Sequence, residues 1–344
     1  MSRSVVAAVV AVVACGGGTG GKPRGDDDAG PPRDADAIGL PPAPPLPGVP
    51  AGLPTPELPA SVTPEAVALG ELLFWDPRLS SGAAISCATC HDPAHGYASA
   101  KRMPTAAGKP YPRRAPTLEN LAWHKELGWD GRYATMAEHL DAHMRTQFGN
   151  DLAAAVARIA ELPGYRAQFA RLGGAPTAER AATALGAFAL TRYQGDTSWD
   201  RAERSGDATA DAKAGYQLFQ TKAQCSVCHT PPLYSDLRYH RLGLISSPDD
   251  GRGRVEPAQK GAFKTPTLRG AARRTGFFHD ASAATLDAAI DWHLAGGTGQ
   301  GADPSIIDPA LRKLALSKPE REQLGAFIRG LTGDAVRPAK PVLP

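Results

Sequence analysis

Two short cysteine motifs constrain this chain more than any other feature. The sequence CATCH occupies residues 87–91 and CSVCH occupies residues 225–229, so a Cys-x-x-Cys pair is twice followed directly by histidine. The chain has five cysteines, and all of them except Cys15 belong to these motifs. No cysteine is therefore left for a structural disulfide elsewhere, and the motifs themselves must explain the cysteine usage.

The spacing is typical of covalent c-type haem attachment. Each thiol adds to one vinyl group of the porphyrin, and the next residue, histidine, is then placed beneath the iron as its proximal ligand. Two alternatives compete: a four-cysteine zinc site, which leaves both histidines unexplained, and a redox-active Cys-x-x-Cys motif, which expects a βαβ context. We predict two covalently bound haem c groups, held by Cys87, Cys90 and His91 and by Cys225, Cys228 and His229.

A similar apolar helix is predicted before each motif. Gly70, Leu73 and Phe74 recur as Gly215, Leu218 and Phe219, so the chain contains a diverged repeat of helix, loop and CxxCH. Thr63 and Pro64 are start signals for the first of these helices. Further helices are predicted over 133–147, 151–171, 177–193, 283–294 and 318–332, and no convincing run alternates with the period of a strand. The predicted fold class is mainly α, with two cytochrome c-like haem domains in tandem after a disordered tether.

The N-terminus has the features of an export signal. Arg3 precedes an apolar segment over 5–14 that is too short to span a bilayer, and VVAC at 12–15 resembles a bacterial lipobox. We predict a lipoprotein signal peptide over 1–15 and a membrane anchor on lipidated Cys15, at the periplasmic side of the bacterial cell envelope. An ordinary signal peptide or a buried N-terminal helix is the alternative.

Composition divides the rest of the chain. Residues 16–59 are rich in proline and glycine and are predicted to form a disordered linker. The chain has 344 residues, of which 42% are hydrophobic, and this is enough for one large or two ordinary domains. We predict two, at 60–204 and 205–335. The net charge is +3 without a clustered basic face, which argues against a nucleic-acid partner.

Several motifs in order give the chain a resemblance to the bacterial di-haem cytochrome c peroxidases and the related tryptophan-modifying di-haem enzymes. The matching segments are LLFWDPRLSSGAAISCATCHDPAHGYA, RRAPTLENLAWHKELGWDGR, CSVCHTPPLYSDLRYHRLGL and GAFKTPTLRGAARRTGFFHDASAATLDAAIDWHLAGG. The resemblance implies that the haem on His91 is the peroxidatic centre and that the haem on His229 is the electron-transfer centre. It also implies that the indole of Trp129 lies between them, and the alternative for Trp129 is a core aromatic.

The resemblance also bears on the distal side of each iron. For the second haem, the family's methionine or tyrosine ligand position falls on His293, and an iron with two histidines would be closed to peroxide. The alternative for His293 is a surface or core histidine. For the first haem, the peroxidases' loop histidine falls on Ala107, and His95 is too close to His91 to reach the opposite face. We expect an open distal side, as in the tryptophan-modifying enzymes, with His124 as the alternative ligand.

Peroxide cleavage also needs a distal acid/base and a polar group. The family's glutamine position holds His139, and its glutamate position holds Gly149. His139, His143 and Gln147 are four residues apart and share one helix face, which we predict to line the distal pocket. A solvated polar face is the alternative. Arg114 stands at an asparagine ligand of the family's calcium ion, so calcium is left open as a cofactor.

Three functions fit these features. The first is a peroxidase that reduces hydrogen peroxide to water with electrons from a small c-type cytochrome or a cupredoxin. The second is a di-haem oxidase that modifies tryptophan or tyrosine of a partner protein through high-valent iron. The third is a non-enzymatic electron-transfer protein, in which both irons are six-coordinate and inert. A homodimer, common in the family, is left open.

Overall fold

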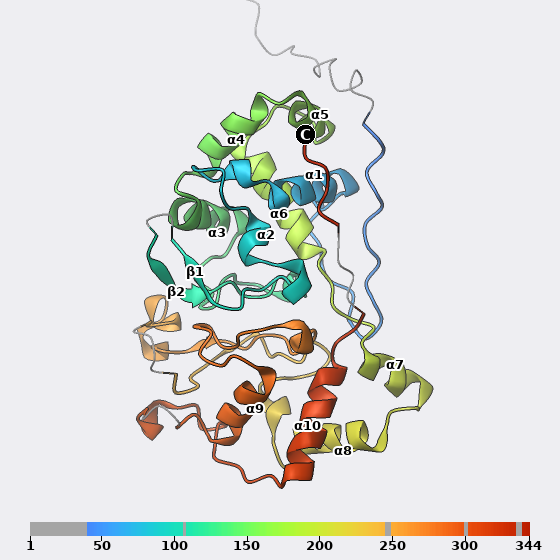
Figure 1. The fold of residues 1–344 in the computed structure, drawn as a ribbon, viewed down its shortest axis with the longest axis vertical. Helices are drawn as coiled ribbons and strands as arrows, with labels where there is room; N and C mark the ends of the chain where they lie inside the picture. Colours follow the sequence, from blue (N-terminus) through green and yellow to red (C-terminus); the bar gives the residue numbers. More distant parts are fainter. Residues whose placement is uncertain (1–39, 106–107, 245–248, 299–301, 335–338) are drawn as a thin grey trace, which may run out of the picture.

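The computed structural model describes residues 40–105, 108–244, 249–298, 302–334 and 339–344. The predicted signal peptide, Cys15 and residues 16–39 of the predicted linker lie outside them. Within the described ranges the chain is mainly helical, as predicted, and it forms two halves stacked along the long axis of the molecule (Figure 1). None of the helices in these ranges has the length and apolar character needed to cross a membrane.

The first half is organised by α1 (Pro64–Trp75), against which α6 (Ala178–Leu190) packs. The predicted start of α1 is confirmed, because the Thr63 side chain accepts a hydrogen bond from the Ala66 N–H. Gly70 allows the close approach of the two helices, since a Cβ there would lie 2.0 Å from the Ala184 carbonyl oxygen. The other elements of this half are α2 (Cys87–Cys90), β1 (Arg102–Pro104), β2 (Pro110–Arg114), α3 (Met136–His143), α4 (Leu152–Ala160) and α5 (Pro163–Arg171).

The second half repeats this arrangement. In it, α8 (Ala210–Gln220) packs against α10 (Lys318–Gly330), and a Cβ on Gly215 would lie 2.1 Å from the Gln323 carbonyl oxygen. The predicted repeat of helix, loop and CxxCH is therefore present, with a glycine at the same helix crossing in each copy. The remaining elements are α7 (Ser198–Ser205), β3 (Tyr239–His240), β4 (Phe263–Lys264) and α9 (Leu286–Leu294). Each strand pair, β1–β2 and β3–β4, is antiparallel and short.

Two predicted boundaries differ from the structure. The helix predicted over 151–171 is divided into α4 and α5, because Pro163 begins a new helix and has no N–H to continue the previous one. The first domain was expected to extend to residue 204, but α7 packs with the second half. The Trp199 ring on α7 lies 4.9 Å from the Phe327 ring on α10, within the second hydrophobic core. The connection between the halves is therefore the segment 191–197, before α7.

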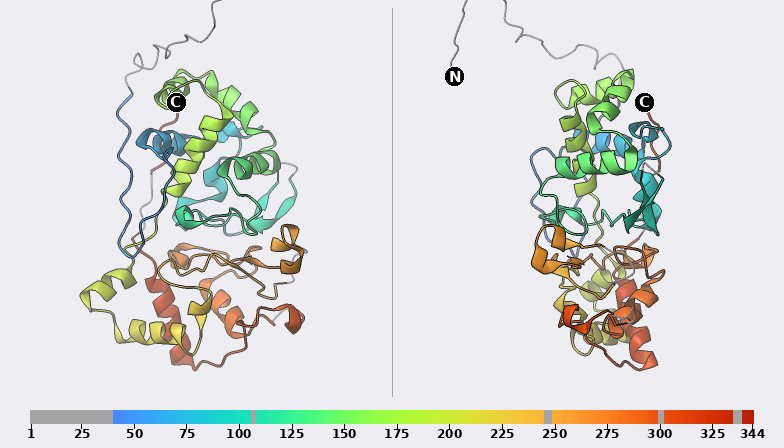
Figure 2. Two further views of the ribbon diagram at one scale, coloured as in Figure 1. Left: turned by 180° about the vertical axis from the view of Figure 1, so that it is seen from behind. Right: turned by 90° about the vertical axis from the view of Figure 1, so that its left-hand side faces the viewer.

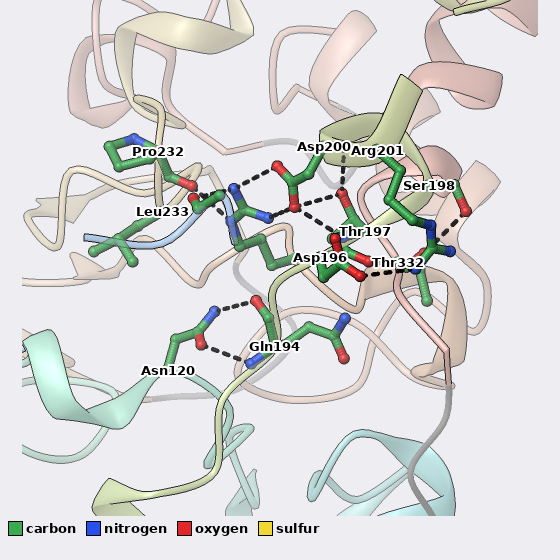
Figure 3. A network of polar contacts seen from close by, with 12 residues as sticks. Asn120, Gln194, Asp196, Thr197, Ser198, Asp200, Arg201, Pro232, Leu233 and Thr332 are labelled. Carbon is green, nitrogen blue, oxygen red and sulfur yellow. Dashed lines mark hydrogen bonds and ion pairs between the residues drawn. The ribbon is translucent and has the colours of Figure 1, made fainter. Parts of the chain in front are cut away.

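This connection is held by a network of polar contacts (Figure 3). The Asn120 side chain pairs with the backbone of Gln194, donating to its carbonyl oxygen at 3.1 Å and accepting from its N–H at 2.9 Å. The Asp200 carboxylate accepts hydrogen bonds from Thr197 at 2.8 and 2.9 Å and from the buried Arg269 guanidinium at 2.6 and 3.0 Å. These contacts attach the connection, residues 191–197, to both halves of the molecule.

Residues 40–59 depart from the predicted disordered linker. They run as an extended chain beside the first half and turn back near the junction of the halves (Figure 2). Arg171 donates to the carbonyl oxygens of residues 40 and 41, and Arg269 donates to that of Gly52 at 2.6 Å. Proline has no N–H group, so a proline-rich segment cannot pair all of its carbonyl oxygens with its own backbone. Arginines of the two halves donate hydrogen bonds to these oxygens instead. The C-terminus also lies on the first half, where Pro344 accepts a hydrogen bond from Arg78.

Candidate haem sites

Each cysteine motif forms a tight turn that ends at its histidine. The His91 N–H donates to the Cys87 carbonyl oxygen at 2.8 Å, and the His229 N–H donates to the Cys225 carbonyl oxygen at the same distance. All four motif cysteines are free thiols. Both motifs therefore share this hydrogen bond and contain no disulfide, although the first is a short α-helix and the second a 3₁₀ turn.

The structure counts against the zinc and redox alternatives. Among the described residues, the group of close metal-ligand side chains that includes a motif cysteine is Cys228, Asp236 and His240, and no group joins the two motifs. A four-cysteine zinc site is therefore not assembled. Burial raises the pKa of the Cys87 and Cys225 thiols to about 12, whereas a redox-active cysteine needs a low pKa to form its thiolate.

The two motif histidines are oriented in the same way. The Nδ1 atom of His91 lies 2.9 Å from the Tyr97 carbonyl oxygen, and that of His229 lies 3.0 Å from the Tyr234 carbonyl oxygen. A proton on Nδ1 serves this hydrogen bond and leaves the lone pair of Nε2 for a metal ion. Burial lowers the pKa of both rings, that of His229 to about 4, which favours the neutral form that ligates. Both residues fit the proximal position of a haem.

The cavity beside the second motif fits a haem with a histidine on each face. Its lining includes His229, both cysteines of the motif and His293 of α9, together with largely apolar residues. The ring centroids of His229 and His293 are 6.3 Å apart. The Nδ1 atom of His293 lies 2.8 Å from the Ala289 carbonyl oxygen, which again leaves Nε2 available.

The four residues predicted for the catalytic site of the first haem line one cavity: Trp129, His139, His143 and Gln147. The His139 ring is stacked on Tyr133, with centroids 4.9 Å apart, and lies 5.5 Å from the His143 ring. The His143 ring in turn lies 6.3 Å from the His91 ring. Gln147 belongs to the π-helical turn η5 (Met144–Phe148), is 4% exposed, and its Oε1 atom has no partner among the described residues.

Two other positions weighed for the first haem, His95 and His124, do not line this cavity. The His95 ring lies 2.9 Å from the Asp92 carboxylate and is partly exposed. His124 lines neither cavity, and burial lowers its pKa to about 3. Ala107 lies outside the described residues.

Two buried arginines line the cavities without complete hydrogen bonding. Arg114 lines the first cavity and Arg274 the second, and the Arg114 Nη2 and Arg274 Nε atoms have no partner among the described residues. Burial lowers the pKa of Arg114 to about 9 and that of Arg274 to about 10, and each is further lowered by a neighbouring arginine. Unpaired cationic donors of this kind fit the propionate groups of haem. A calcium ion beside Arg114 would meet like charge.

Trp129 lines both the cavity beside the second motif and the cavity that contains His139 and His143. Its Nε1–H donates to the Arg114 carbonyl oxygen at 2.9 Å. The backbone around it joins the halves reciprocally: the Lys264 N–H donates to the Trp129 carbonyl oxygen at 2.8 Å, and the Arg114 N–H donates to that of His279 at 2.7 Å. The indole is thus held at the junction.

The chain contains a second repeat, which was not predicted from the sequence and which these reciprocal hydrogen bonds reveal. Residues 113–143 recur as 263–293 without insertion, with the sequence PTL at 116–118 and at 266–268. The structure matches in both copies: 3₁₀ turns at Leu121–Trp123 and Ala271–Arg273, bridges Leu127–Tyr133 and Phe277–Ala283, and threonine caps on α3 and α9. In this register Trp129 corresponds to His279, and His143 corresponds to His293.

Several known proteins are similar to this chain in sequence or in fold. A family model described as di-haem cytochrome c peroxidase matches residues 64–209. The methylamine utilization protein MauG of Methylorubrum extorquens is 35% identical over 299 residues, covering 82% of each chain. The cytochrome-c peroxidase IdrP2 of Denitromonas iodatirespirans is 30% identical over 322 residues, covering 81% of this chain and 85% of the relative. The crystal structure of a MauG-like protein associated with microbial copper homeostasis has a TM-score of 0.75 at 25% identity, over 85% of this chain and 98% of the other. These matches confirm the resemblance: this chain belongs to the di-haem cytochrome c peroxidase family.

Proposed function

We propose that this protein is a di-haem cytochrome c peroxidase. In the proposed reaction one molecule of hydrogen peroxide takes up two electrons and two protons and yields two molecules of water. The electrons come from two molecules of a small one-electron donor, a c-type cytochrome or a cupredoxin. The observation that carries the proposal is the position of Trp129, whose side chain lines both haem cavities and so offers a short path between them.

We assign the two haem groups to the two tandem halves. When bound, the haem groups supply one-electron redox chemistry and an iron that can take a ligand from solution. In this assignment the first group is the peroxidatic centre, and the second transfers electrons from the donor. The attaching thiols are those of Cys87, Cys90, Cys225 and Cys228, and the iron ligands are His91, His229 and His293.

His139 and Gln147 supply the proton transfer and polarity of the first site in this proposal. Burial lowers the pKa of His139 to about 4, so its ring is neutral and one nitrogen can accept a proton from peroxide and return it to the departing oxygen. The stacking on Tyr133 orients that ring. The Gln147 amide, with an unpaired Oε1, can hydrogen-bond peroxide beside it.

We also propose that the protein works at the periplasmic side of the cell envelope, held by lipidated Cys15. The short apolar segment and the lipobox-like residues 12–15 support this assignment. A peroxidase in that position meets small soluble electron donors directly.

A second candidate function is the oxidation of tryptophan or tyrosine on a partner protein. The 35% identity with methylamine utilization protein MauG favours it, because that relative is as similar to this chain as the peroxidases are. In this alternative the electrons travel from the partner to the haem groups, and the small donor is a poor substrate.

The experiment that separates these functions is a donor oxidation assay with the full chain and both haems in place. Reduced c-type cytochrome and reduced cupredoxin are mixed separately with the protein, and peroxide is added. Steady oxidation of a donor, two molecules per peroxide, supports the peroxidase. A long-lived oxidised state with little donor turnover supports the partner oxidase. If peroxide reacts in neither assay, the remaining candidate is a non-enzymatic electron-transfer protein.

A further inference from the structure

A pair of histidine rings faces each other in each half of the molecule. The ring centroids of His229 and His293 are 6.3 Å apart, and those of His91 and His143 are also 6.3 Å apart. An imidazole nitrogen binds a transition metal at about 2 Å with its ring centre about 1 Å behind, so two rings on opposite sides of one ion have centres about 6 Å apart. In each pair, the two rings therefore have the separation expected if they bind opposite sides of one metal ion.

The fold makes His143 the counterpart of His293. Both lie in the last turn of a helix that begins after a capping threonine, Thr135 for α3 and Thr285 for α9. The two helices belong to the repeated segments 113–143 and 263–293, which align residue by residue. The sequence register and the ring separation are independent observations, and both match His143 to His293.

Nothing else in the described part of the chain engages the His143 ring. It makes no hydrogen bond to another described residue, and its ring contacts are His91 and His139. An imidazole without a hydrogen-bond partner in the protein has a nitrogen lone pair that is free to bind a metal ion.

We propose that His143 is the distal axial ligand of the first haem iron, so that both irons are six-coordinate with two histidines in the resting protein. This rests on the proposed assignment of the first haem to His91, and it replaces the open distal side expected from the sequence. Peroxide then has to displace His143, while His139 and Gln147 stay beside the vacated position. The π-helical turn η5 begins directly after His143, and such turns often mark functional positions in helices.

Electron paramagnetic resonance of the ferric full-chain protein tests the proposal. The pyridine haemochrome spectrum first establishes that two c-type haems are present per chain. We expect only low-spin signals in the unmodified protein. In His143→Ala, about half of the iron should become high-spin, because one of two haems loses a strong ligand. Added imidazole should then restore the low-spin signal by filling the vacated space.

Azide binding is a second measurement, and it needs no variant to establish the resting state. We expect slow and weak azide binding to the unmodified protein and binding at least about tenfold faster in His143→Ala, since the ligand no longer has to be displaced. A high-spin signal or rapid azide binding in the unmodified protein would overturn the proposal. An unchanged spin state in His143→Ala would also overturn it.

His139→Ala is the matched control, since His139 lies one turn earlier on α3 and lines the same cavity. We expect this variant to keep its low-spin signals. Spin state reports ligation and not turnover, so the two proposals fail separately. If His143→Ala changes spin state but no donor is oxidised by the unmodified protein, the peroxidase assignment fails and the ligation stands. If the resting first haem is high-spin and donor is oxidised, the ligation fails and the peroxidase stands.

Discussion

His143 and His293 occupy the same place in two copies of one structural unit, yet their surroundings differ. One turn before His143 lies His139, whereas the residue one turn before His293 is the buried Ala289. The first cavity also holds the unpaired Oε1 of Gln147, and the second is lined mainly by apolar side chains. The first site therefore places a second histidine and an unpaired amide oxygen beside the proposed distal ligand, which is why we assign peroxide chemistry to it.

Replacing His293 with methionine should raise the reduction potential of the second haem. A thioether ligand stabilises ferrous iron relative to imidazole, and axial ligands tune haem potentials over about 0.8 V, so we expect an increase on the order of 0.1 V with the low-spin state retained. A spectroscopic redox titration measures the change. Leu294→Met is the control, because this neighbouring residue lines the same cavity. An equal shift in both variants would show that His293 does not bind the iron.

The sequence predicted the parts of this fold that depend on local patterns. The CxxCH turns, the capped start of α1 and the helical class follow from residue spacing and capping chemistry, and the structure has all three. The assignment of α7 to the second half could not be predicted from local patterns. It depends on the contact of Trp199 with Phe327, more than 100 residues later in the chain, and no local pattern encodes that contact.

The distal side of the first haem shows the same limit. The spacing of His139, His143 and Gln147 predicted a shared face, and one cavity is lined by all three. Spacing alone could not distinguish an acid/base from a ligand, because that depends on the distance from His143 to His91 across the fold. The repeat of 113–143 at 263–293 was the signal in the sequence that would have aligned His143 with His293.

Trp129→Phe should slow electron transfer between the two haems without removing either. The phenyl ring fills part of the same space but is much harder to oxidise, and it loses the hydrogen bond to the Arg114 carbonyl oxygen. We expect donor oxidation to fall by about tenfold or more, equivalent to about 1.4 kcal/mol in the barrier. Stopped-flow absorption measures this rate. Trp123→Phe is the control, because Trp123 lines neither cavity. Equal rates in the two variants would remove Trp129 from the path.

Gly70→Ala should destabilise the first half selectively, and Gly215→Ala the second. In each case the new methyl group would meet a backbone carbonyl oxygen of the crossing helix, at 2.0 Å from Ala184 and 2.1 Å from Gln323. Backbone cannot move aside as a flexible side chain does, so we expect a loss of about 1–3 kcal/mol in the free energy of unfolding.

Urea unfolding followed by circular dichroism measures this loss, and the Soret spectrum shows which haem is disturbed. Gly82→Ala is the control, because a Cβ at Gly82 has no atom within 4 Å. A loss of stability in all three variants would indicate a general effect of the added methyl group and would contradict the role of the helix crossing.

Arg113 links the two halves through two buried carboxylates, and this link should make stability depend on acid. Its guanidinium donates to Asp130 in the first half at 2.8 Å and to Asp249 in the second half at 2.6 and 2.8 Å. Burial alone would raise the pKa of Asp249, but the hydrogen bond and charge of Arg113 outweigh it and hold the pKa at about 2, below the usual 3.8. A carboxyl group whose pKa is lower in the folded than in the unfolded protein increases the free energy of unfolding when the pH is above the unfolded-state pKa. This stabilisation is lost as the pH falls through the folded-state pKa. We therefore expect this stabilisation to be complete above about pH 4 and to disappear between about pH 4 and pH 2.

Asp249→Asn should remove that acid dependence and lower the free energy of unfolding at pH 7 by about 3 kcal/mol, because the buried guanidinium loses one of its two carboxylate partners. Thermal unfolding measured across this pH range, by circular dichroism, checks both effects. Asp250→Asn is the matched control, since Asp250 is exposed and its ion pair with Lys260 is at the surface, where such pairs contribute about 0–1 kcal/mol. If both variants have the same stability at pH 7, Arg113 does not hold the halves together. If only Asp249→Asn is destabilised, the buried pair fixes the junction at which Trp129 lies.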